Sequence, residues 1–198
     1  IDKRRFLAST DQSLQAKQEL QIQIKSDKKA KKLIISDNGV GMDSDDMISS
    51  LGTIARSGTK NFIEQLKTSA QNDENKLSLI GQFGVGFYAA FMVAETVDVI
   101  SRKIGSSKAY KWHSDGSTGY SLDTAEREEE GTDIILYLKK DAKEFMEEQR
   151  ISFMVKKYSD HLSIPIYWHN AEASTMINSA SAIWTRPKSD ITQEQYKS

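Results

Sequence analysis

The sequence lacks cysteine altogether, so disulfides, thiolate zinc sites and cysteine nucleophiles are excluded. It also lacks a long apolar run: the longest, Phe83 to Ala94, has about half the length that a membrane span needs, and glycines interrupt it. The opening residues 1–5 have neither an initiator methionine nor the apolar core of a signal peptide. These absences predict a soluble, cytoplasmic protein without a membrane partner.

Neither sign of charge is in excess. Lys and Arg number 27 and Asp and Glu 28, which gives a formal net charge of -1. A globally basic surface built for phosphate backbones is therefore not expected, and we predict no nucleic-acid partner. The three histidines share no metal-ligand spacing, so no metal site is expected in this chain.

Hydrophobic periodicity predicts an α+β protein. Strict alternation at 20–24 and the apolar run at 33–35 predict two strands, and the polar turn between them predicts an antiparallel pair. A short helix at 43–51 would be capped by Asp43 or Ser44. Further strands are expected at 96–102, 109–113, 119–122, 132–138 and 164–168, and helices at 1–16, 87–93 and 144–162.

The predicted architecture is a two-layer α/β sandwich, with a mostly antiparallel sheet covered by helices on one face. The strand at 132–138 is apolar on both faces, so we expect it near the middle of the sheet. We expect residues 1–169 to form one domain, and residues 170–198 to be a linker and the start of another.

The first informative glycine-rich turn is Ile35-Ser36-Asp37-Asn38-Gly39-Val40-Gly41-Met42. Asn-Gly after a strand is typical of a hairpin turn, which is one interpretation of this segment. The other is a binding site, because Asp37 ends a strand and glycines permit close approach of the backbone to a ligand. A carboxylate there would accept a hydrogen bond from an exocyclic amine such as that of adenine, and Met42 would pack on the ring.

A second glycine-rich turn, from Ile80 to Tyr88, precedes the helix expected at 87–93. Backbone N–H groups at a helix start can bind phosphate, aided by the helix dipole. The alternative is that the glycines only allow the helix to pack closely on the sheet. Neither the Rossmann spacing nor a Walker sequence occurs, so a nucleotide bound here would need another fold.

In combination, these turns resemble the nucleotide-binding domain of the 90-kDa heat-shock protein chaperones. The resemblance rests on Asp37-x-Gly39-x-Gly41, the run from Gly52 to Lys60, the run from Gly81 to Phe87, and Gly131-Thr132. That family shares a superfamily with gyrase B, histidine kinases and MutL, and residues 157–161 and 183–186 look most like its bacterial branch. The resemblance covers nearly the whole chain. It implies the Bergerat-type ATP-binding fold, ATP or ADP with Mg²⁺ held through the nucleotide, and a homodimeric chaperone for unfolded client proteins.

The resemblance also implies site residues. Asp37 would take the adenine amino group, Thr132 would hold the base through water, and residues 52–76 would form a lid. Arg56 falls where the family has a lid lysine, and Lys3 matches a helix lysine close to the phosphates. The full implied set is Lys3, Asp37, Gly39, Gly41, Met42, Arg56, Ser57, Gly84, Val85, Gly86, Phe87 and Thr132.

The catalytic groups of the family fall outside the matching positions. Its general-base Glu and Mg²⁺-binding Asn would precede Asp2, and the arginine that reaches the γ-phosphate would follow Ser198. Phosphoryl transfer needs such groups. We therefore expect no catalytic or metal-binding residue within this chain and little ATP hydrolysis by it alone, although the full-length protein should be an ATPase.

Two other functions stay open from the sequence. One is a gyrase-like or mismatch-repair ATPase of the same superfamily, against which the near-neutral charge argues because such proteins contact DNA. The other is a non-enzymatic interaction module whose glycine turns serve packing only. Nucleotide titration would separate the second from the ATPases.

Overall fold

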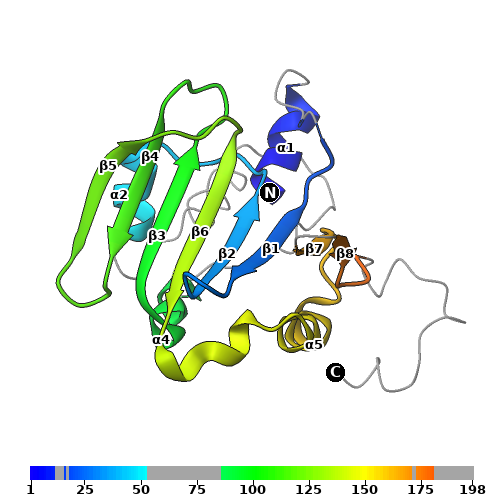
Figure 1. Ribbon diagram of the computed structural model, residues 1–198. Coiled ribbons are helices and arrows are strands. Elements are labelled where there is room, and N and C mark those ends of the chain that lie inside the picture. Colours follow the sequence, from blue (N-terminus) through cyan, green and yellow to red (C-terminus); the bar gives the residue numbers. More distant parts are fainter. Residues whose placement is uncertain (12–15, 17, 53–85, 171–172, 181–198) are drawn as a thin grey trace, which may run out of the picture.

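The computed structural model describes residues 1–11, 16, 18–52, 86–170 and 173–180 (Figure 1). Predictions that fall on other residues, such as the segment at 52–76 beyond Gly52, lie outside this described part. The described elements are, in chain order, α1 (Asp2–Thr10), β1 (Ile22–Asp27), β2 (Lys32–Asp37), α2 (Ser44–Leu51), the 3₁₀ helix η2 (Gly86–Ala89), α4 (Ala90–Val93), β3 (Ala94–Arg102), β4 (Ala109–Ser114), β5 (Tyr120–Ala125), β6 (Gly131–Leu138), the 3₁₀ helix η3 (Lys140–Met146), α5 (Glu148–Ser159), β7 (Ile166–His169) and β8 (Ser174–Met176).

The strands form one eight-stranded sheet in the order β5-β4-β3-β6-β2-β1-β7-β8. Neighbouring strands are antiparallel except β1 and β7, which run parallel. The predicted hairpin is confirmed, with Ile24 opposite Ile35. The predicted central place of β6 is also confirmed, since it lies between β3 and β2. The expected α+β class with a mostly antiparallel sheet is therefore correct.

The hydrophobic core lies on one face of the sheet, between the strands and the helices. Val97, Val99 and Trp112 come from alternate positions of β3 and β4 and are almost fully buried. They belong to one cluster with Met47 of α2 and Ile151 of α5. In Figure 1, α2 and α4 lie behind the sheet. Val97, Val99 and Trp112 thus share the face of the sheet that the helices cover.

The opposite face carries a polar cluster around Asp98. Its carboxylate accepts hydrogen bonds from Lys111 Nζ at 2.8 Å, His113 Nδ1 at 2.5 Å and Tyr137 OH at 3.0 Å. Burial alone would raise the pKa of Asp98, but these three partners outweigh it and lower the pKa below its usual range. The three partners thus supply the hydrogen bonds that a buried carboxylate such as that of Asp98 needs.

The helix predicted at 87–93 is confirmed in its position, but it is not the regular, buried helix that its apolar sequence suggests. This segment forms η2 followed by a single α-helical turn, α4, and it is only half-buried, with Met92 78% exposed. Lys139 Nζ donates to the carbonyl oxygens of Phe91 and Met92. The chain enters β3 directly afterwards, at Ala94.

The helix predicted at 144–162 is two helices. η3 ends at Met146, and α5 begins at Glu148, because Glu147 between them has extended backbone angles. Long-range contacts explain the break: Ser26 Oγ donates to the Met146 carbonyl at 3.0 Å, and Lys28 binds the Glu147 carboxylate. These contacts with β1 and its turn override the helical periodicity of the local sequence.

The sheet continues past the expected domain boundary at residue 169. β8 pairs antiparallel with β7, and Ile177 is buried. The Asn178 side chain accepts from Ile166 N at 2.9 Å and donates to the Ile164 carbonyl at 2.9 Å. Part of the predicted linker is thus packed on the sheet, and the position where the domain ends stays a prediction.

Candidate functional site

Asp37 ends β2, directly opposite the first residues of β6. It is paired in register with Thr132, so both side chains project from the core face of the sheet. Asp37 Oδ1 accepts the Gly39 N–H at 2.7 Å, and its other oxygen has no hydrogen-bond partner within the described residues. Burial raises the pKa of Asp37, more than the nearby positive charges and the Gly39 N–H lower it. Within the described part of the chain, this carboxylate therefore keeps one acceptor oxygen without a hydrogen bond.

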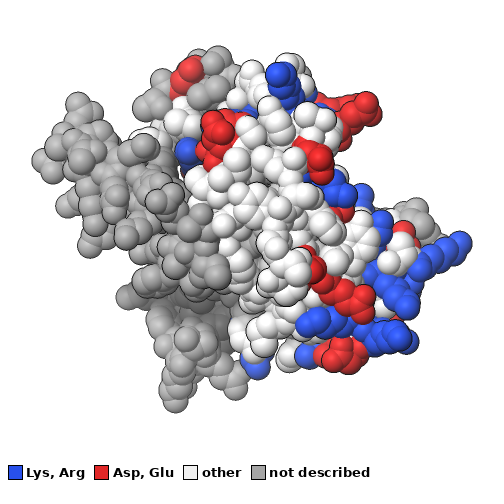
Figure 2. All heavy atoms as spheres, turned by 90° about the vertical axis from the view of Figure 1, so that its left-hand side faces the viewer, with Lys and Arg blue, Asp and Glu red and all other residues white. Residues whose placement is uncertain are grey.

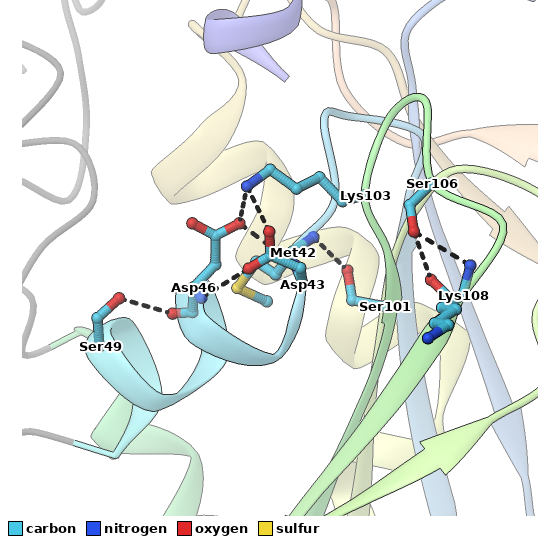
Figure 3. A network of polar contacts seen from close by, with 8 residues as sticks. All are labelled: Met42, Asp43, Asp46, Ser49, Ser101, Lys103, Ser106 and Lys108. Atoms are coloured by element: carbon cyan, nitrogen blue, oxygen red, sulfur yellow. Dashed lines mark hydrogen bonds and ion pairs between the residues drawn. The ribbon is translucent and has the colours of Figure 1, made fainter.

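The loop after Asp37 is fixed to the end of β3. Ile104 N donates to the Val40 carbonyl at 2.7 Å, and Met42 N donates to Ser101 Oγ at 2.8 Å (Figure 3). Gly41 between these anchors has φ +63, and a Cβ on it would run into the Arg102 carbonyl. Only glycine tolerates both the left-handed backbone and this contact. The contacts with β3 and the required glycine fix the conformation of this loop. A simple hairpin turn would need neither.

The first turn of α2 continues this fixed segment. Asp43 caps α2 by accepting from Asp46 N at 2.9 Å, as the sequence predicted. Lys103 Nζ lies 2.7 Å from carboxylate oxygens of both Asp43 and Asp46 (Figure 3). These hydrogen bonds raise the pKa of Lys103. The end of β3 thereby holds both the loop and the helix that follows it.

Ser101 links the loop to Thr132. Its Oγ lies 2.8 Å from the Gly131 carbonyl oxygen and 2.9 Å from Thr132 Oγ1, in addition to the bond from Met42 N. The Ser101 side chain is fully buried, and Thr132 is 8% exposed. Gly131 has φ +122, and a side chain on it would overlap the Asp37 carbonyl oxygen. β2, β3 and β6 therefore meet closely at this end of the sheet.

Helix α1 borders the loop from another side. Arg4 Nη1 donates to the carbonyl oxygens of Asn38 and Gly39 at 3.0 and 3.1 Å, and Arg4 Nη2 binds Glu130 at 2.7 Å. A hollow lined by Arg4, Asn38 and Arg102, among others, adjoins the turn. Lys3 lies on the same helix and is exposed. The structure thus brings the helix of Lys3 to the loop, but the described contacts to the loop come from Arg4.

The second glycine turn is described only from Gly86 onward. A Cβ on Gly86 would meet no atom within 4 Å, so close packing does not explain this glycine in the described part of the chain. Phe87 packs edge-on against Trp112, with ring centroids 5.5 Å apart. Tyr88 OH donates to the Leu51 carbonyl at 2.9 Å and so joins η2 to the end of α2.

The structure therefore brings together five of the twelve predicted residues. Asp37, Gly39, Gly41, Met42 and Thr132 meet at the joint end of β2, β3 and β6. Phe87 belongs to the aromatic cluster around Trp112, Gly86 precedes it at the start of η2, and no described contact joins either residue to Asp37. Lys3 lies on α1, and the other four, Arg56, Ser57, Gly84 and Val85, lie outside the described residues.

Sequence reasoning missed Ser101 and Lys103. Ser101 follows Val97 and Val99 at alternate positions of β3, so a polar residue stands where the strand turns an apolar face to the core. That break in an otherwise apolar face is the signal that could have identified Ser101. No comparable signal marks Lys103, because its partners Asp43 and Asp46 are distant in the sequence.

Neither a metal cluster nor a membrane-crossing helix is found in the described part of the chain. Across residues 1–11, 16, 18–52, 86–170 and 173–180, no three acidic or histidine side chains gather as metal ligands. In the same ranges, every helix is too short or too polar to cross a membrane. On the face shown in Figure 2, blue and red side chains are interspersed in the described part.

A protein-family model places this geometry in a known class. The model for histidine kinase-, DNA gyrase B-, and HSP90-like ATPases matches residues 9–142. This range includes β2, the Asp37 loop, Ser101 and Thr132. The chain belongs to this family, as its resemblance to the 90-kDa heat-shock chaperones predicted.

Curated relatives narrow the similarity further. The chain is 52% identical over 196 residues to the "Chaperone protein HtpG" of Roseobacter denitrificans, covering 98% of this chain and 30% of that protein. It is 49% identical to that of Gluconobacter oxydans, covering 98% and 32%, and 48% identical to that of Rickettsia rickettsii, covering 99% and 32%. The chain spans about a third of the length of the curated relatives that it matches.

Proposed function

We propose that this chain is the ATP- and ADP-binding domain of an ATP-dependent molecular chaperone that assists the folding of client proteins. The observation that carries the proposal is the half-buried Asp37 carboxylate, paired in register with Thr132, one oxygen of which accepts no hydrogen bond from the described residues. Its family and its similarity to HtpG chaperones support the same function. A gyrase-like role has no comparable support.

The base of the nucleotide would bind at the joint end of β2 and β6. Asp37 would accept a hydrogen bond from the exocyclic amino group, and in a site shielded from water a charge-assisted bond of this kind is strong. Met42, whose backbone N–H is fixed to Ser101, would line the ring, and Thr132 would reach it through water. Gly39 and Gly41 keep the loop backbone close to the ligand.

The phosphates would lie toward the second glycine turn. Backbone N–H groups of residues 84–87 would hold them, with Arg56, Ser57 and Lys3 adding polar contacts. Mg²⁺ would be held through the nucleotide. Among the described residues, no group of acidic or histidine side chains gathers as a ligand set for it.

Hydrolysis is proposed for the whole protein. The chain's residues bind and orient the nucleotide, and the general base and the arginine on the γ-phosphate would come from other parts of the full-length chaperone. The full-length protein would be a cytoplasmic homodimer in which nucleotide binding controls lid closure and clamping on clients. Its partners would be adenine nucleotides and unfolded proteins, with no nucleic acid and no membrane.

Two measurements test this proposal. Calorimetric titration of the chain should show binding of ADP, and much weaker binding of GDP because its carbonyl would face the Asp37 carboxylate. Refolding of a denatured client by the full-length protein should depend on ATP. An absence of ADP binding by a folded chain would refute the nucleotide-binding role, and ATP-dependent DNA supercoiling without client refolding would refute the chaperone role.

A further inference from the structure

We propose that Ser101 is a positioning residue for adenine recognition, because its single hydroxyl proton decides which way the Thr132 hydroxyl points. The inference rests on the proposed function, since it concerns how the base of the nucleotide is recognised. Ser101 itself is fully buried and would not touch the ligand. It would act through Thr132 and through the backbone of Met42.

The proton count at Ser101 leads to this inference. A hydroxyl donates one hydrogen bond and accepts two. The Gly131 carbonyl, 2.8 Å away, can only accept, so Ser101 must donate to it. Met42 N can only donate, so Ser101 accepts from it at 2.8 Å. The third contact, at 2.9 Å to Thr132 Oγ1, is then satisfied when Thr132 donates and Ser101 accepts.

This arrangement fixes the character of the site. The Thr132 proton points inward to Ser101, and the lone pairs of its oxygen remain for a ligand or a water. Asp37, opposite Thr132 in the register, also offers only acceptors when it is ionised. The end of the sheet thus presents two neighbouring acceptors, and whatever binds must bring donors to both.

An amino group beside an unprotonated ring nitrogen meets that demand. The amino group donates to Asp37. One water molecule then donates one hydrogen to the ring nitrogen and its other hydrogen to Thr132, which bridges the two acceptors. A ring with a carbonyl beside an N–H, as in guanine, places an acceptor against Asp37 instead. Ser101 would thereby favour adenine over guanine without contacting either.

The rest of the fixed segment supports this role. Ser101 is one of several contacts by which the end of β3 holds the loop, together with Ile104 N on Val40 and Lys103 on Asp43 and Asp46 (Figure 3). Those contacts hold the position of the loop. Among these described contacts between the end of β3 and the loop, it is the Ser101 hydroxyl that also contacts Thr132.

The test compares ADP with 1-deaza-ADP, in which a C–H replaces the ring nitrogen beside the amino group. Ser101→Ala should weaken ADP binding about ten-fold, which is the usual scale for a lost buried hydrogen bond. The 1-deaza analogue cannot use the bridging water, so its affinity should change little. The ratio of ADP affinity to 1-deaza-ADP affinity should therefore be about five-fold or more lower in Ser101→Ala than in wild type. Ser101→Cys replaces the hydroxyl by a somewhat larger thiol that is a weak donor and acceptor, and it should give the same direction of change if the alanine variant does not fold.

Ser114 provides a matched control. It is a buried serine in β4 that donates to the Gly119 carbonyl and accepts from Gly116 N, away from the Asp37 loop. Ser114→Ala should leave the ratio of affinities unchanged. An unchanged ratio in Ser101→Ala or Ser101→Cys would overturn the inference while leaving the proposed function intact, because wild-type protein would still bind ADP. Failure of folded wild-type protein to bind ADP would instead refute the proposed function.

Discussion

Asp37 and Thr132 face each other across neighbouring antiparallel strands, and both project from the core face of the sheet at its end. Asp37 is the last residue of β2, and Thr132 is the second residue of β6. Residues paired in this way keep a fixed separation set by the ladder of backbone hydrogen bonds. The pairing holds the two side chains of the candidate site at a fixed distance. Substitutions at and around this pair should therefore affect nucleotide binding and folding stability to different degrees.

Asp37→Asn should abolish ADP binding, because the asparagine amide would present a donor to the donating amino group of adenine. The fold should persist, since the asparagine oxygen can still accept from Gly39 N. Calorimetry with ADP measures the loss. Asp98→Asn, a buried aspartate on the opposite face, is the control and should keep its affinity. Equal ADP affinity in a folded Asp37→Asn protein would contradict the assignment.

The pH dependence of stability should separate the same variant from wild type. Burial raises the pKa of Asp37 above its unfolded value, so its contribution to folding stability is present below the unfolded pKa and is lost as pH rises through the folded pKa. Asp37→Asn removes this loss. Urea unfolding should therefore show that the variant gains stability relative to wild type between acidic and neutral pH. A relative loss over that range would show that Asp37 stabilises the fold when ionised.

Gly41→Ala should destabilise the protein by about 2 kcal/mol or more. The left-handed backbone alone costs a Cβ about 1–2 kcal/mol, and contact with the Arg102 carbonyl adds to this cost. Gly105→Ala is the matched control, because Gly105 has φ +75 but open space around a Cβ, so it should lose only about 1 kcal/mol. Urea unfolding measures both variants. Equal losses would mean that the loop can move away from β3.

Gly86→Val should leave stability nearly unchanged and abolish ATP and ADP binding. A Cβ at Gly86 meets no atom within 4 Å, whereas we expect the phosphates to approach this backbone closely. Thermal unfolding and ADP titration together provide the test. Adenosine, which lacks phosphates, should lose less affinity than ADP. Loss of stability with unchanged ADP affinity would assign Gly86 to packing.

Asp98→Asn should lower stability at pH 7 by about 1–3 kcal/mol, because a buried acceptor of three hydrogen bonds loses its charge. The folded-state pKa of Asp98 is lowered, so its contribution is present above the unfolded pKa and is lost as pH falls through the folded pKa. The difference in the free energy of unfolding between Asp98→Asn and wild type should therefore become smaller at acidic pH. Asp123→Asn, at an exposed position of β5, should change stability by less than about 0.5 kcal/mol. A gap that stays constant with pH would contradict this account.

Local sequence predicted the elements whose signals are local. The hairpin of β1 and β2 follows from alternation and a polar turn, and the start of α2 follows from the Asp43 cap. The break at Glu147 could not be predicted in this way, because it depends on Ser26 and Lys28 of a distant hairpin. β8 was missed because Ser174–Met176 is short and exposed and pairs only at the sheet edge.

The candidate site divides in the same way. Asp37 and the glycines after it were predictable, because a strand end followed by glycines is visible in the sequence. Ser101 was not predicted, because its partners Met42, Gly131 and Thr132 come together only when β2, β3 and β6 assemble. The alternation in β3 marks Ser101 as a polar residue on an apolar face, but it does not show which residues of the other strands Ser101 contacts.

The parallel pairing of β1 with β7 has a consequence for how the molecule is made. Ile22 pairs with Ile166, and Asn178 then fastens the strand that contains Ile166. The chain between these partners includes most of the sheet, so closing this contact carries a large loop-closure cost. During synthesis, one edge of β1 must wait until the ribosome has released nearly all of these 198 residues. We therefore expect a folding intermediate in which the β1–β2 hairpin has formed and this edge of β1 is still unpaired.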